Sequence, residues 1–93
     1  MKGGVFGRVI GVGKNARFTV KLTPIEGVQR ANIFIYLQQK KTFGYKNIKS
    51  ANVNSISGGT RSFYKNPEGT YRIYLRNYTG IEMRGKSYIS WSW

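Results

Sequence analysis

The feature that most constrains the fold of this chain is the two-residue alternation of apolar and polar side chains. It is cleanest in residues 16–24 and 70–77. Successive side chains of a β-strand point to opposite faces of the sheet, so this period predicts antiparallel strands with one face buried and one face in water. The side chains expected to face the core are those of Phe18, Val20, Leu22, Tyr71, Ile73 and Leu75.

Residues 30–38 are apolar on both faces, because the residues that alternate with isoleucine and Leu37 are Phe34 and Tyr36. This predicts a central strand that is covered on both sides or exposes an aromatic face for a purpose. Glycine and proline turn signals separate about seven short strands, and 93 residues suffice for one domain. We therefore expect residues 1–93 to form a single all-β domain, an immunoglobulin-like antiparallel sandwich, with an OB-like barrel as the alternative.

The charge balance favours a binding protein over an enzyme. The chain has 16 Lys and Arg against three Glu, a formal net charge of +13, and contains no His, Cys or Asp. General acid–base chemistry and metal sites usually need His, Cys or clustered carboxylates. A strongly basic domain attracts polyanions. We expect no catalytic residue, no metal, no cofactor and an anionic partner.

Arg72, Tyr74 and Arg76, continued by Tyr78, form the first candidate binding site. They alternate with the expected core residues of strand 70–77, so they should line its solvent face as a ladder of cations and aromatic rings. Such a ladder can stack on bases or sugars, or lie among lipid headgroups, with arginine binding phosphate. The structural alternative is an ordinary solvated sheet face.

The second candidate is a lysine-rich segment near the middle of the chain. We expect residues 39–44 to form a loop, followed by a weaker strand at 45–53. A basic loop with an aromatic tip can contact a membrane or a polyanion, while lysines near an edge strand also prevent edge-to-edge pairing. The residues concerned are Lys40, Lys41, Phe43, Tyr45, Lys46 and Lys49.

The C-terminal strand, residues 86–93, places Ile89, Trp91 and Trp93 on one face. Tryptophans that alternate on a last strand usually close a sandwich core. The functional alternative makes Trp93, at the C-terminal end, an anchor at a membrane interface.

Residues 7–28 resemble the first hairpin of S1-like OB-fold RNA-binding proteins. The match includes Gly7, Val9, Asn15, Phe18, Val20 and Leu22, and covers about a quarter of the chain. The resemblance implies RNA contacts by Arg17, Phe18 and Lys21. Together with Tyr36, Arg72 and Tyr74, the first two of these residues would form a single-stranded nucleic-acid-binding face.

A second resemblance covers residues 31–80 and about half the chain. The order Leu37-Gln38-Gln39-Lys40-Lys41, then Tyr45-Lys46, then Gly69-Thr70-Tyr71-Arg72 is similar to that of small exported β-sandwich proteins of Firmicutes, some of which are bacteriocins. The segment 67–71 also resembles the corner of immunoglobulin-like sandwiches that a tyrosine ties down.

These observations favour a small non-enzymatic protein that contacts an anionic bacterial surface. Teichoic acid, lipid II and anionic phospholipid are the expected ligands, and the resemblance implies secretion from a Gram-positive bacterium and antimicrobial activity. The alternative is a cytoplasmic nucleic-acid-binding protein. A structural or virion-associated protein without a ligand is a third class.

Overall fold

The computed structural model describes residues 3–24, 32–77 and 86–93, with the side chains from Phe6 onward in the first of these ranges. These ranges contain β-strands and turns. The strands are β1 (Gly3–Phe6), β2 (Ile10–Val12), β3 (Ala16–Leu22), β4 (Asn32–Lys41), β5 (Gly44–Asn54), β6 (Gly59–Asn66), β7 (Gly69–Asn77) and β8 (Ser87–Ser92).

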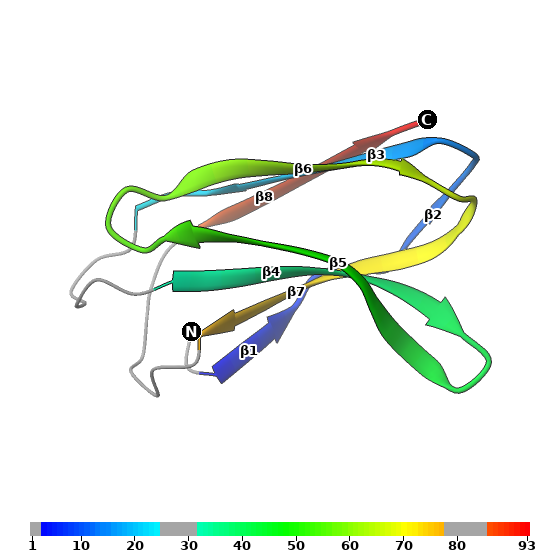
Figure 1. Cartoon of the computed structure of the whole chain (residues 1–93), viewed down its shortest axis with the longest axis horizontal. Helices are drawn as coiled ribbons and strands as arrows, with labels where there is room; N and C mark the ends of the chain where they lie inside the picture. Colours follow the sequence, from blue (N-terminus) through cyan, green and yellow to red (C-terminus); the bar gives the residue numbers. More distant parts are fainter. Residues whose placement is uncertain (1–2, 25–31, 78–85) are drawn as a thin grey trace.

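The strands form two antiparallel sheets that lie one above the other (Figure 1). Sheet A has the order β1-β7-β4-β5, and β2 extends the same edge by pairing with β7. Sheet B has the order β6-β3-β8. The expected antiparallel sandwich is confirmed. β1 and β2 share one edge position, which gives seven positions in all, and the described strands do not close into the OB-like barrel that was the alternative fold.

Two pairs of strands have the arrangement of an immunoglobulin-like sandwich. β3 pairs with β6 in one sheet and β4 pairs with β7 in the other, as strands B, E, C and F do in that fold. The terminal strands differ. β1 and β2 occupy the free edge of β7, and the last strand, β8, pairs with β3 instead.

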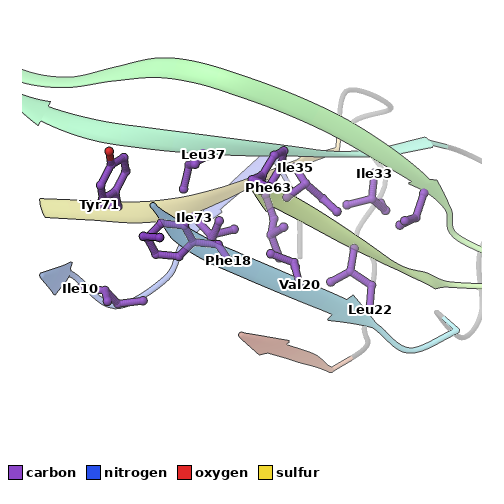
Figure 2. Close-up of a cluster of buried hydrophobic side chains, with 13 residues drawn as sticks. Ile10, Phe18, Val20, Leu22, Ile33, Ile35, Leu37, Phe63, Tyr71 and Ile73 are labelled. Atoms are coloured by element: carbon purple, nitrogen blue, oxygen red, sulfur yellow. The ribbon is translucent and has the colours of Figure 1, made fainter. Parts of the chain in front are cut away.

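The core lies between the two sheets and contains the side chains that the alternation predicted (Figure 2). β3 contributes Phe18, Val20 and Leu22, which alternate with exposed or half-buried neighbours. All predicted core residues of β7 are buried as well. β4 and β5 add further side chains to the core from sheet A, and β6 contributes Phe63 from sheet B. The remaining core residues are Ala16 at the start of β3 and, from other strands, Ile10, Ile33, Ile35, Leu37, Val53 and Phe63.

Two segments differ from the expectation. Residues 39–41 are not in a loop, because β4 continues to Lys41 and pairs there with Gly44. The loop is therefore only Thr42 and Phe43, and Gly44 follows with a φ of 89°, the left-handed backbone that closes such a turn. At the C-terminus, Trp91 packs partly against the core, but Trp93 is 68% exposed and lies over Gly13.

Tyr71 ties the β6–β7 corner to the core, as the resemblance of segment 67–71 implied. Its hydroxyl donates a hydrogen bond to the carbonyl oxygen of Pro67 at 2.5 Å and accepts one from Nε2 of Gln39 at 3.2 Å. The ring is fully buried and packs against Phe18 with the centroids 5.0 Å apart. This burial raises the pKa of the Tyr71 hydroxyl above its ordinary value of 10.0.

Replacing Tyr71 by phenylalanine should lower the free energy of unfolding by about 1 kcal/mol at pH 7, because the Pro67 carbonyl loses its donor. The raised pKa gives the neutral hydroxyl a stabilising effect that is complete below the unfolded-state pKa. This effect disappears as the pH rises through the folded-state pKa. The difference between wild type and Tyr71→Phe should therefore shrink above pH 10. Urea unfolding of both proteins at several pH values measures this difference. The control is Tyr88→Phe, because the Tyr88 side chain is exposed.

Candidate functional site: an aromatic–cation face on sheet A

The outer face of sheet A combines aromatic rings with cations. Register places the outward side chains of β1, β7 and β4 next to one another: Phe6 opposes Tyr74, and Tyr74 opposes Tyr36. Tyr45 of β5 belongs to the same face, where it packs against Arg72. We call this surface the aromatic–cation face and define it by Phe6, Phe34, Tyr36, Tyr45, Arg72, Tyr74 and Arg76.

The rings of this face stack on one another across the strands. The centroids of Phe6 and Tyr74 are 4.5 Å apart at an interplanar angle of 22°, and those of Tyr74 and Tyr36 are 5.9 Å apart at 26°. Along β4, Phe34 and Tyr36 are 6.4 Å apart. Offset stacking of this kind stabilises each ring pair by about 1 kcal/mol beyond its buried area. The outward rings of β4 that the sequence left unexplained are thus part of a stacked row.

Arg72 occupies the centre of the arrangement. Its guanidinium carbon lies 4.0 Å from the ring centroid of Phe6 and 3.9 Å from that of Tyr45, so the planar group is held between two rings. Its Nε donates a hydrogen bond of 2.7 Å to Oε1 of Gln38, and Gln38 is fixed in turn by a bond of 2.8 Å to Asn47. Within the described residues, the two terminal nitrogens of Arg72 make no hydrogen bond. A guanidinium held this way presents its remaining donors in a fixed orientation.

The rest of the predicted ladder is divided. Tyr74 and Arg76 lie on the aromatic–cation face, half-buried, and Nη1 of Arg76 donates to the Tyr74 hydroxyl at 3.0 Å. Arg76 is therefore hydrogen-bonded to one of the stacked rings. Tyr78 lies outside the described residues. The only described residue with a carboxylate side chain is Glu68, in the turn before β7, so the face itself carries no carboxylate in the part of the chain described.

The lysine-rich segment is the tip of the β4–β5 hairpin, residues 40–46. The pairing of β4 with β7 ends at Gln39, so the tip is not paired with β7, and Figure 1 shows it projecting at one end of the sandwich. Lys40 pairs with Tyr45 on the aromatic–cation side. Lys41 and Lys46 belong to the opposite side of the hairpin, where Nζ of Lys41 donates to Oε1 of Gln39 at 2.8 Å.

Phe43 and Lys49 have different surroundings from each other. Phe43 is 99% exposed at the turn, in agreement with its prediction as an aromatic tip. Lys49 does not belong to the tip, because its ammonium donates to the backbone carbonyl of Tyr64 on β6. The structure therefore separates Lys49 from the other lysines of the segment.

The residues of the nucleic-acid alternative do not form one surface. Tyr36, Arg72 and Tyr74 share the aromatic–cation face, whereas Arg17 is exposed on sheet B. Phe18 was an incorrect choice, because its ring is fully buried and no ligand reaches it. Arg17 borders an open depression of about 200 Å³ on sheet B. The other residues lining it are Thr19, Ser90, Trp91 and Ser92.

Sequence reasoning did not name Phe6 and Phe34 of the aromatic–cation face as site residues, nor Gln38, which fixes Arg72. Phe6 lies in a glycine-rich segment with a weak strand signal, and its place opposite Tyr74 depends on the pairing of β1 with β7. Gln38 is the outward residue of β4 opposite Arg72, and it is polar yet nearly buried. The one signal in the sequence for Gln38 was its uncharged amide at an outward position of the strongly apolar strand 30–38.

Comparison of the chain with protein-family models, curated proteins and solved structures found no match. Within the described ranges, no group of three or more His, Cys, Asp or Glu side chains could hold a metal ion. The same ranges contain no helix long and apolar enough to span a membrane.

Proposed function

We propose that this protein is a non-enzymatic binder of phosphate-bearing components of the bacterial envelope: teichoic acid, lipid II or anionic phospholipid. The aromatic–cation face would be the contact surface, in an exported protein with antimicrobial activity. The observation that carries the proposal is the guanidinium of Arg72, held between Phe6 and Tyr45 and fixed through Gln38, with its terminal nitrogens without a described partner.

The chemistry of this arrangement fits a phosphate group. A guanidinium donates two parallel hydrogen bonds to a pair of phosphate oxygens, and such charge-assisted bonds are among the strongest in proteins. Because the rings and Gln38 already restrict Arg72, little conformational entropy remains to be lost on binding. The net charge of +13 adds a long-range attraction that salt weakens.

Single-stranded nucleic acid is the second candidate, since Tyr36, Arg72 and Tyr74 lie together on one face. Proteins that bind single strands stack bases on open aromatic rings. Here the faces of Tyr74 are turned towards Phe6 and Tyr36 at 4.5 and 5.9 Å, so base stacking would have to displace one ring from another. This cost favours a ligand that offers phosphate without a base.

A binding comparison at about 150 mM salt, where non-specific charge attraction is reduced, tests the proposal. The ligands are wall teichoic acid, vesicles with and without phosphatidylglycerol, and single-stranded RNA. We expect saturable binding to the first ligand or to the anionic vesicles that is stronger than binding to RNA. Tight binding to RNA alone would support the nucleic-acid function and refute the envelope function.

A further inference from the structure

The tip of the β4–β5 hairpin exposes an apolar ring at the farthest point of a projecting element. A single exposed apolar side chain is normal on a protein surface. Phe43, however, is 99% exposed in a turn of only two residues, beyond the last pairing of β4 with β7. In this position the ring can enter an apolar phase without any rearrangement of the sandwich.

The hairpin carries cations on both of its sides behind this ring. Lys40 lies on the aromatic–cation side, and Lys41 and Lys46 lie on the other. Lysine chains reach several ångströms and place their ammonium groups in the polar layer of a membrane while the stem lies along apolar surface. An apolar tip with a collar of lysines is suited to an anionic bilayer, where each cation near the surface adds to the attraction.

The base of the hairpin is held in place. Lys41 donates to Gln39, Gln39 donates to the Tyr71 hydroxyl, and Tyr71 donates to the Pro67 carbonyl. This chain of hydrogen bonds joins the hairpin to the β6–β7 corner. Tyr45 joins it to sheet A on the opposite side through Arg72. The base of the tip is therefore held on both of its sides.

The spacing along the hairpin matches the depth of a lipid headgroup layer. Phe43 lies in the turn and Tyr45 is the second residue of β5, so the two residues are separated by at most about 7 Å along the hairpin. Interfacial elements bury their apolar side roughly 5–10 Å into the boundary between headgroups and acyl chains. When the Phe43 ring reaches that boundary, Lys40 and the guanidinium of Arg72 beside Tyr45 lie at the level of the lipid phosphates.

We infer that the β4–β5 hairpin docks the protein on an anionic phospholipid bilayer, with Phe43 inserted at the acyl boundary and Arg72 and Lys40 on lipid phosphates. This rests on the proposed function and names the lipid headgroup as the source of the phosphate. The C-terminus, with the exposed Trp93, lies at the same end of the long axis as the hairpin (Figure 1). That end thus presents two exposed aromatic side chains.

The absence of cysteine from the sequence permits a clean probe of insertion. A Thr42→Cys variant labelled with the polarity-sensitive dye NBD reports on the tip and leaves Phe43 in place. A Thr60→Cys variant, on the exposed face of β6, is the matched control. With vesicles that contain phosphatidylglycerol, we expect a blue shift and a several-fold rise in emission from the Thr42 probe alone. Vesicles of pure phosphatidylcholine should give a much smaller change.

The substitution Phe43→Ala separates the inference from the proposed function. Because the side chain is solvent-exposed, the variant should fold normally, yet its partitioning into anionic vesicles should fall about tenfold. Binding to soluble wall teichoic acid should change less than twofold. A silent Thr42 probe on vesicle-bound protein, or on protein that binds only the soluble polymer, overturns the insertion and leaves the proposed function intact. A protein that binds neither the vesicles nor the polymer overturns both the insertion and the proposed function.

Discussion

Replacing Arg72 by alanine is expected to lower the affinity for a phosphate polymer by about 10–100-fold at physiological salt, the usual effect of losing hydrogen bonds to a charged group. The loss should exceed the effect of removing one charge, because the guanidinium between Phe6 and Tyr45 is fixed before the ligand arrives. Arg72→Lys tests this point. Lysine keeps the charge but neither fills the space between the rings nor offers paired donors, so it should restore little of the affinity.

The matched control for Arg72→Ala is Arg61→Ala. Arg61 lies exposed on β6 and donates a hydrogen bond only to the neighbouring Thr60 carbonyl among the described residues. The two variants have the same net charge, so a titration with teichoic acid over a range of salt concentrations compares them directly. We expect Arg61→Ala to bind within about twofold of wild type. Equal losses for the two variants would mean that the binding depends on total charge and that the aromatic–cation face is merely a solvated surface.

Replacing Phe18 by alanine should lower the free energy of unfolding by about 3–5 kcal/mol, the usual cost of removing a large aromatic side chain from a core. Phe18 is fully buried on the central strand of sheet B and packs against Tyr71 from sheet A. The cavity would therefore open between the two sheets. A small domain has little stability to spare, so much of the purified variant is expected to be unfolded.

Urea unfolding of Phe18→Ala should be compared with that of Phe6→Ala. Phe6 undergoes the same chemical change, but its side chain is 54% exposed and belongs to the aromatic–cation face. We expect this control to lose only about 1 kcal/mol of stability and to bind phosphate polymers more weakly than wild type. A Phe18→Ala protein with unchanged stability and impaired RNA binding would contradict the buried role of Phe18.

Much of the fold could be predicted because alternation is a local property. The inward residues of β3 and β7 follow from the two-residue period alone, and the tyrosine at the β6–β7 corner follows from a short segment, 67–71. The end of β4 could not be predicted in this way. Gln39, Lys40 and Lys41 have the composition of a loop, and it is pairing with β5 that keeps them extended.

The sequence by itself determined that this chain is an all-β, strongly basic domain, and it favoured an antiparallel sandwich over an OB-like barrel. It also placed Arg72 and Tyr74 outward on one strand. Only the tertiary structure brought Phe6, Tyr45 and Gln38 around Arg72, since these residues come from three other strands. The physical reason is that alternation fixes the face on which a side chain lies, whereas strand order and register, which depend on contacts between distant segments, fix its neighbours.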